Sequence, residues 1–250
     1  VLDLIRPSYF LYKTPHDKYI DIRDIKGNQI NNSFSFVIIN FYDLLDSKTL
    51  KISRDKNNLL IHTVNILLDL IITNKAQLIL IVNKHFYSEP KTRYQKIYNG
   101  VVEFYIQYFN VTSQIEGFQF KLFLLPNIYG RKESKRSIVR TIFSKIISQE
   151  DLILEKTERD FIYIDDFIKR LLEDIFNPDY KIVEYYSEEK HSLQELYKYI
   201  SEILNAETDR FDISPNYFLK RIDYDETNYI KIPSKIEDNL YKIRELKKDG

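Results

Sequence analysis

The chain contains no cysteine and no methionine among its 250 residues, and it has only five glycines. The absence of cysteine excludes disulfide bonds, thiolate nucleophiles and cysteine-ligated metal ions. The glycines are too widely separated for a Gly-x-Gly-x-x-Gly or Gly-x-x-Gly-x-x-Gly arrangement, which can hold a pyrophosphate at a helix N-terminus. They stand at Gly27, Gly100, Gly117, Gly130 and Gly250. A glycine-rich phosphate loop is therefore excluded from these 250 residues.

Long apolar runs are also missing. A membrane-spanning helix needs about 18 uninterrupted apolar residues. The richest window, from Leu59 to Ile72, is interrupted by His62, Asn65 and Asp69. The first residues show no basic region followed by an apolar block, so we expect no secretory signal and a soluble, cytoplasmic protein. Because position 1 is not methionine, we also expect that the sequence does not begin at a natural start codon.

Neither sign of charge is in excess, since the chain has 37 basic and 37 acidic residues. This balance argues against a general nucleic-acid surface. The histidines, His16, His62, His85 and His191, show no paired spacing, so we expect no metal site. With 44% hydrophobic residues, the chain can bury the core of one domain, or of one domain with a lobe.

Apolar residues follow strand and helix periodicities in turn. Residues 34–40 are almost continuously apolar, as buried parallel strands are, and residues 57–73 have helical spacing. Ser192–Glu195 and Ser234–Glu237 are predicted capping boxes that open two later helices. Strands are predicted at residues 1–5, 18–24, 34–40, 77–82, 118–125 and 180–185, and helices at 57–73, 93–109 and 138–147. This alternation predicts an α/β fold with a parallel sheet.

Two short stretches stand out in the second half of the chain. Residues 159–166 read Arg-Asp-Phe-Ile-Tyr-Ile-Asp-Asp, a strand that leads straight into a helix. Either Asp165 or Asp166 is the expected N-cap of that helix. About thirty residues upstream, residues 127–130 read Asn-Ile-Tyr-Gly and predict a strand end that breaks into a turn.

The order of strand, Asn-Ile-Tyr-Gly, amphipathic helix, Arg-Asp-Phe-Ile-Tyr-Ile-Asp-Asp and helix resembles the NAD-dependent epimerase/dehydratase family. These extended short-chain dehydrogenases/reductases act on nucleotide sugars. The resemblance covers nearly the whole chain and implies a truncated, Rossmann-like, doubly wound parallel sheet with a small C-terminal α/β substrate lobe. The implied core is residues 1–128, completed by 157–176, and the implied lobe is residues 129–156 and 177–250. The resemblance also implies NAD or NADP as cofactor, although the first strand and the glycine-rich loop that hold it are absent from this sequence.

The family's catalytic positions carry amides here. Its reaction starts by oxidising a sugar hydroxyl, with a tyrosinate as base, a lysine four residues on, and a Ser or Thr that holds the reacting oxygen. Aligned with the family, Gln95 takes the tyrosine position, Asn99 the lysine position and Asn83 the Ser/Thr position. Amides neither titrate near neutral pH nor carry charge. The resemblance therefore implies a catalytically impaired protein, a pseudoenzyme of carbohydrate biosynthesis.

Positions that match substrate contacts survive better. Asn127 matches an asparagine that contacts the sugar-nucleotide diphosphate, and Arg159 and Arg221 match arginines that reach the same phosphates. Taken alone, Asn127 is equally a turn residue and Arg159 equally a member of an ion pair. The helices at 57–73 and 93–109 match those that pair between subunits in the family, which implies a homodimer.

Two alternatives stay open. The sequence is the C-terminal part of an active enzyme whose glycine-rich loop lies upstream, or it is a structural or dimerisation partner of such an enzyme. The first alternative does not restore the catalytic tyrosine and lysine, because the positions of Gln95 and Asn99 lie inside the present sequence. The residues do not indicate which nucleotide sugar would be bound.

Overall fold

The computed structural model describes residues 10–12, 20–21, 36–40, 54–84, 93–130, 137–206, 210–214 and 227–241. The strand predicted at residues 1–5 and the predicted phosphate contact Arg221 lie outside these ranges.

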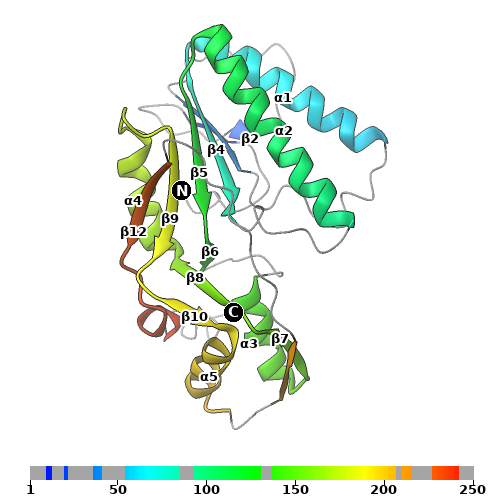
Figure 1. Cartoon of the computed structure of the whole chain (residues 1–250), viewed down its shortest axis with the longest axis vertical. Coiled ribbons are helices and arrows are strands. Elements are labelled where there is room, and N and C mark those ends of the chain that lie inside the picture. Colours follow the sequence, from blue (N-terminus) through cyan, green and yellow to red (C-terminus); the bar gives the residue numbers. More distant parts are fainter. Residues whose placement is uncertain are drawn as a thin grey trace. The chain divides into compact units, whose positions relative to one another are not determined.

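Helices and strands alternate along the described chain, as the apolar pattern predicts (Figure 1). The helices are α1 (Arg54–Asn74), α2 (Arg93–Glu116), α3 (Ile138–Ser148), α4 (Ile164–Ile175) and α5 (Leu193–Leu204). The strands are β1 (Phe10–Tyr12), β2 (Ile20–Asp21), β3 (Phe36–Asn40), β4 (Gln77–Asn83), β5 (Phe120–Leu125), β6 (Asn127–Tyr129), β7 (Leu152–Glu155), β8 (Glu158–Tyr163), β9 (Ile182–Ser187), β10 (Lys190–Ser192), β11 (Phe211–Ser214) and β12 (Thr227–Ile232). None of the described helices is long and apolar enough to cross a bilayer.

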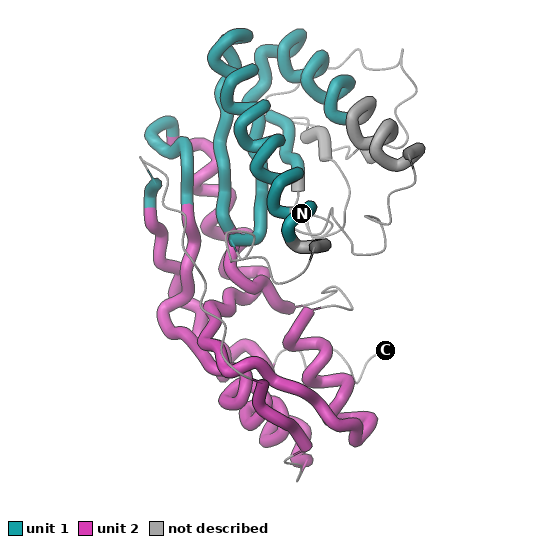
Figure 2. The backbone as a smooth tube through the Cα atoms, turned by 45° about the vertical axis from the view of Figure 1, so that its right-hand side comes forward, with its two compact units in different colours: residues 1–124, 178–183, 221–228 teal, residues 125–177, 184–220, 229–250 magenta. Residues whose placement is uncertain are grey.

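One compact unit consists of residues 1–124, 178–183 and 221–228 (Figure 2). The strands that lie almost entirely within this unit have the order β5-β4-β3-β1-β2 in their sheet. β3 and β4 pair in parallel, whereas β1 pairs antiparallel with both β3 and β2. Five strands form a parallel sheet in a Rossmann-like order, so the predicted α/β class is confirmed.

The core of this unit lies between its central strands and the two long helices. Residues 78–82 of β4 are each at most 3% exposed, which explains why this strand is apolar without interruption. Side chains at helical spacing pack against it from Val64, Leu67 and Ile71 of α1 and from Val102 and Phe109 of α2. Burial of each such side chain contributes about 1.5–3 kcal/mol. The helices predicted at 57–73 and 93–109 are confirmed, and both extend beyond those bounds.

The second compact unit consists of residues 125–177, 184–220 and 229–250 (Figure 2). It contains a three-stranded sheet of order β10-β8-β6, in which β8 is parallel to β6 and antiparallel to β10. A separate parallel pair joins β7 and β11. Helices α3 and α5 contact each other, and α5 also contacts β7. The predicted boundaries of core and substrate lobe stay a prediction.

Helix α5 begins with the predicted capping box. The Ser192 hydroxyl accepts a hydrogen bond from the Glu195 backbone N–H at 3.1 Å, and the Glu195 carboxylate accepts one from the Ser192 N–H at 2.8 Å. Two of the backbone donors that have no partner within the helix are therefore satisfied reciprocally.

The expected N-cap of α4 at Asp165 or Asp166 is wrong. The helix begins at Ile164, with Tyr163 at the N-cap position and no side-chain cap. Tyr163 still belongs to β8, and its backbone N–H donates to the Ser234 hydroxyl at 3.0 Å. The two aspartates instead lie in the first helical turn, where their negative charge stabilises the helix by interacting with the positive end of its dipole.

Candidate functional site

The two stretches that carry the family resemblance lie side by side as β6 and β8 (Figure 1). Asn127 begins β6 and pairs in register with Phe161, and its half-buried side-chain amide donates to the carbonyl of Asp160 at 3.1 Å. Residues 127–129 are thus a strand rather than only the predicted turn. The reason is long-range, because β8 supplies the backbone partners that β6 needs.

Gly130 follows β6 and has a positive φ of 146°. A Cβ atom at this position would overlap the side chain of Ile164 and crowd the ring of Tyr163. The glycine is therefore required both by its backbone conformation and by close packing against the start of α4.

Arg159 lies on β8 and is partly buried. Its Nη2 atom is 2.7 Å from the Glu155 carboxylate, and its Nε donates to the Thr157 hydroxyl at 3.2 Å. About a quarter of the Arg159 side chain and a third of the Glu155 side chain remain exposed, at 24% and 37%. The arginine is thus held in place by an ion pair that solvent can reach.

Asp160, which is not among the residues predicted for the site, is a buried acid next to Arg159. It is 5% exposed, and its Oδ1 lies 3.3 Å from the Ser187 hydroxyl. That hydroxyl also lies 2.5 Å from the carbonyl oxygen of Glu189. Because a hydroxyl carries one hydrogen, the shorter contact is the stronger bond.

Two tyrosines are buried beside the Asn127 strand. The ring centroids of Tyr129 and Tyr163 are 5.6 Å apart, and both residues are 1% exposed. Burial raises the pKa of the Tyr129 hydroxyl well above its ordinary value, while Asn239 and Ser234 partly lower it. Within the described chain, the Tyr129 hydroxyl makes no well-formed hydrogen bond. A tyrosine in this state does not supply a tyrosinate base near neutral pH.

The helical residues 236–241 contact α4 through a polar side chain, and Ser234 just before them contacts β8. Asn239 donates to the Lys235 carbonyl at 3.0 Å, and its amide lies 3.4 Å from both Asp166 Oδ2 and Ser234 Oγ. Ser234, predicted to open this helix as a cap, accepts the Tyr163 backbone N–H through its hydroxyl.

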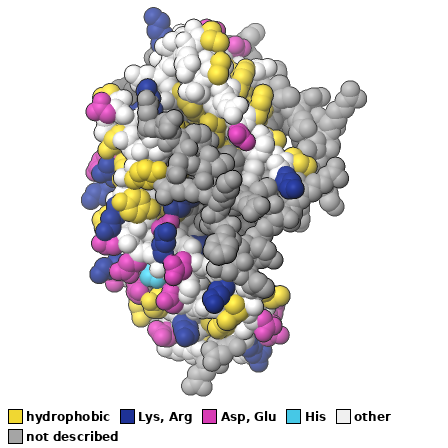
Figure 3. Space-filling model, in the orientation of Figure 1, with side chains coloured by type: hydrophobic (Ala, Val, Ile, Leu, Met, Phe, Trp, Pro, Cys, Tyr) yellow, Lys and Arg dark blue, Asp and Glu magenta, His cyan; other side chains and the backbone are white. Residues whose placement is uncertain are grey.

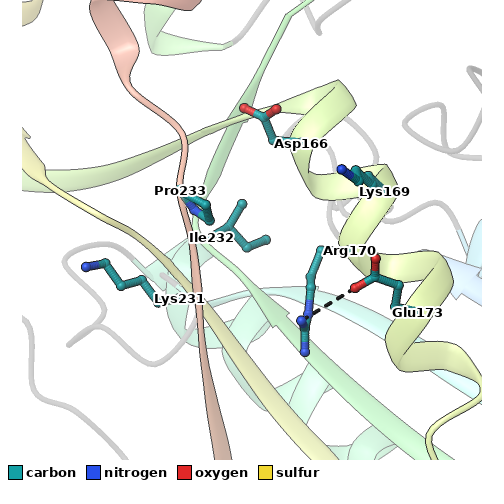
Figure 4. A pocket seen from close by; sticks show the side chains of 7 residues that line it. All are labelled: Asp166, Lys169, Arg170, Glu173, Lys231, Ile232 and Pro233. Carbon is teal, nitrogen blue, oxygen red and sulfur yellow. Dashed lines mark hydrogen bonds and ion pairs between the residues drawn. The ribbon is translucent and has the colours of Figure 1, made fainter.

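A charged pocket of about 260 Å³ opens between α4 and β12 (Figure 4). It is lined by Asp166, Lys169, Arg170, Glu173, Lys231, Ile232 and Pro233. Arg170 is paired with Glu173 at 3.5 Å and with the buried Asp174 at 2.8 Å, and Lys231 is paired with Glu188 at 3.2 Å. Of the predicted residues whose side chains the structure describes, Asn83, Asn99, Asn127 and Arg159, none lines this pocket.

The structure places the three predicted catalytic positions in the first compact unit. Asn83 is the last residue of β4 and Asn99 lies on α2, and both are half-buried. Gln95 also belongs to α2, but its side chain lies outside the described part. Of the predicted substrate contacts, Asn127 and Arg159 are brought together on the β6–β8 pair.

No family model matches this chain, and no curated protein matches it in sequence. Its fold is nevertheless that of solved epimerases and dehydratases. The UDP-N-acetylglucosamine 4-epimerase from Methanobrevibacter ruminantium M1 superposes with a TM-score of 0.64 at 13% identity, over 92% of this chain and 82% of that one. The ADP-L-glycero-D-manno-heptose-6-epimerase from Helicobacter pylori gives 0.60 at 15% identity, over 85% and 72%. The dTDP-glucose 4,6-dehydratase from Bacillus anthracis gives 0.57 at 10% identity, over 75% and 67%. The predicted likeness to NAD-dependent epimerases and dehydratases of the extended short-chain dehydrogenase/reductase type is confirmed at the level of fold.

Proposed function

We propose that this protein binds a nucleotide sugar beside Asn127 and Arg159 and is impaired in the oxidation chemistry of the enzymes whose fold it shares. The observation that carries this proposal is the pairing of β6 with β8, which sets Asn127 next to the strand that bears Arg159. The likeness in fold supports it, because similar solved structures hold UDP-glucose, UDP-glucuronic acid and UDP-N-acetylmuramic acid.

Arg159 would bind the diphosphate by exchanging partners. A guanidinium fork fits phosphate oxygens well, and the Glu155 carboxylate now occupies that fork. A solvent-accessible ion pair of this kind is worth about 0–1 kcal/mol, so its loss opposes ligand binding only weakly. Asn127 would add an amide next to the same phosphates, from the end of the predicted core at its border with the lobe.

Impaired catalysis rests on the amides at Asn83, Gln95 and Asn99, which can neither take a proton from a sugar hydroxyl nor supply positive charge. Tyr129, the buried tyrosine next to Asn127, does not replace the missing base, because burial raises its pKa. We therefore infer that neither these three amides nor Tyr129 carries out the proton transfer that starts the reaction.

A dinucleotide does not fit the glycines that the structure describes. Gly100 lies inside α2, Gly117 follows α2 with a φ of 74°, and the space beside Gly130 is filled by Ile164. None of these three glycines lies in a strand-to-helix turn that could hold the pyrophosphate of NAD or NADP. An active enzyme whose phosphate loop precedes this segment remains the alternative.

Calorimetric titration with a UDP-sugar tests the proposed site. The unchanged protein is expected to bind, and the variant Arg159→Gln is expected to bind at least about tenfold more weakly. The reason is that the variant loses a charge-assisted hydrogen bond, which is worth about 1.5–3 kcal/mol. Arg210→Gln is the matched control, because Arg210 is exposed and its guanidinium donates to the Gln149 carbonyl, away from Asn127 and Arg159 in the sequence. Equal affinities of the two variants would overturn the assignment of Arg159, and turnover of any nucleotide sugar would overturn the inferred impairment.

A second proposal concerns association between copies of this chain through α2. Five large apolar side chains of this helix are exposed, at 36–74%, in a repeat of seven, four, three and four residues. They are Ile97, Phe104, Tyr108, Val111 and Ile115. Such spacing forms one stripe along a helix, and a stripe of this size supports helix pairing. Figure 3 shows exposed hydrophobic side chains on the upper part of the molecule, where α1 and α2 lie in Figure 1. This dimer is the proposed form of the predicted homodimer.

A further inference from the structure

We propose that Glu189, His191 and Glu237 form a binding site for a first-row divalent metal ion, with Zn²⁺ as the best fit. One carboxylate oxygen from each glutamate and one imidazole nitrogen lie within 4.8 Å of one another. The proposal is independent of the nucleotide-sugar site.

Three separate elements bring these side chains together. Glu189 lies in the turn between β9 and β10, His191 is the central residue of β10, and Glu237 belongs to the last helical turn. The turn is held by the Ser187 hydroxyl at 2.5 Å from the Glu189 carbonyl oxygen, and β10 is held by its pairing with β8. No spacing in the sequence joins residues from a turn, a strand and a helix, so histidine spacing alone predicts no site here.

The second observation is the state of His191. It is only 6% exposed, and within the described chain its imidazole forms no hydrogen bond. Its neighbour is the ring of Tyr199, edge-on at 5.9 Å between centroids. Coordination of a metal ion would supply a partner for one of its nitrogens.

Tyr199 supports the site from behind. Its hydroxyl donates a hydrogen bond to the Glu237 carboxylate, and the negative charges of Glu237, Glu195 and Glu189 act on it. A hydroxyl that holds a carboxylate in this way orients it as a metal ligand.

Two basic side chains near this trio, Arg159 and Lys231, have other partners. Arg159 stands opposite His191 in the β8–β10 pairing, and its guanidinium is engaged by Glu155 at 2.7 Å. Lys231 is paired with Glu188 at 3.2 Å, next to Glu189 in the turn. These two charges therefore do not neutralise the pair of carboxylates as a divalent ion would.

The ligand set selects the kind of ion. Imidazole nitrogen suits Zn²⁺ and its neighbours in the first transition row, whereas Mg²⁺ and Ca²⁺ prefer sites made of oxygen alone.

The three ligand atoms must move closer together to hold an ion. Metal–ligand bonds of about 2.0–2.2 Å place tetrahedral ligand atoms about 3.3–3.6 Å from each other. Glu189 is exposed and Glu237 half-buried, so small rotations of these side chains can close the trio onto an ion. Three protein ligands leave a position open for water or a further ligand.

Titration of the tag-free full chain with Zn²⁺, followed by calorimetry against a competing chelator, tests the site. We expect one Zn²⁺ per chain, at least about tenfold weaker binding in Glu189→Gln and in Glu237→Gln, and about tenfold weaker binding in Tyr199→Phe. Glu116→Gln is the control, because it removes an exposed carboxylate of α2 that is not part of the trio and should leave the affinity unchanged. No stoichiometric binding, or equal affinity in Glu237→Gln and Glu116→Gln, would overturn the proposal, and so would equal binding of Mg²⁺ alone.

Histidine ring resonances of the unchanged protein give a second readout. The chain has four histidines, and Zn²⁺ is expected to shift one set of ring signals, the set absent from the spectrum of His191→Asn. A shift of another histidine with no change at His191 would overturn the assignment.

Discussion

Gly130 lies so close to Ile164 that a Cβ atom on the glycine would overlap the Cγ2 of the isoleucine. This contact joins the end of the Asn127 strand to the start of α4, the two stretches that carry the likeness to the epimerases. It explains in physical terms why a glycine ends the Asn-Ile-Tyr-Gly stretch.

Replacing Gly130 by alanine is therefore expected to lower the free energy of unfolding by about 2–4 kcal/mol, from overpacking together with strain at a positive φ. Gly100→Ala is the control, because a Cβ there meets nothing within 4 Å and the residue lies in α2. That change should raise stability by about 1 kcal/mol. Urea unfolding measures both values, and a Gly130→Ala protein as stable as the unchanged one would contradict the packing described.

Tyr185 is expected to stabilise the buried carboxylate of Asp174. Its hydroxyl donates to Asp174 Oδ2 at 2.8 Å, and Asp174 is 1% exposed. Tyr185→Phe keeps the edge-on ring contact with Phe167 and removes only the hydrogen bond to a charged group, at a cost of about 1.5–3 kcal/mol. The exposed Tyr241→Phe should change stability by less than about 0.5 kcal/mol, and equal effects of the two changes in urea unfolding would refute this role.

The capping box of α5 gives a prediction with a defined dependence on pH. Hydrogen bonds from the backbone N–H and the hydroxyl of Ser192 lower the pKa of Glu195. A lowered pKa stabilises the fold above the ordinary pKa of a glutamate, and this contribution is lost as the pH falls through the lowered value. Because Glu195 is exposed, Glu195→Gln should cost only about 0.3–0.5 kcal/mol at neutral pH and nothing near about pH 2. Unfolding measured at both pH values checks this, and a difference that grows in acid would show the sign to be wrong.

The apolar stripe on α2 predicts association in solution. A double change of Phe104→Glu and Ile115→Glu, at positions 58% and 74% exposed, should convert a dimer to a monomer without loss of helix content. Ile153→Glu, at an equally exposed position on β7, should leave the dimer intact. Light scattering distinguishes these forms, and a monomeric unchanged protein would remove the second proposal.

Local patterns in the sequence predict the regular elements of this fold well. The uninterrupted apolar run of β4 and the helical spacing of α1 are properties of neighbouring residues. The structure therefore has a strand and a helix where these patterns predict them. The Ser192–Glu195 capping box is equally local, and the structure confirms it.

Features that depend on distant partners were not predictable in this way. Asn127 to Tyr129 form a strand because β8, about thirty residues further along the chain, pairs with them. The trio of Glu189, His191 and Glu237 meets only after a turn, a strand and a helix have been brought together. Asp160 shows no signal in the sequence beyond its place next to Arg159, because its burial depends on β10 and Ser187.

The central claim is that a nucleotide-sugar site persists without the oxidation chemistry, and a thermal-shift panel of nucleotide sugars with NAD and NADP tests it most directly. A ligand that binds only the folded state at 100 times its Kd adds about 2.7 kcal/mol to stability, which a melting curve resolves. We predict that at least one nucleotide sugar raises the Tm of the protein and that neither dinucleotide does so alone. No shift with any nucleotide sugar, or a shift with NAD or NADP only, would contradict the account.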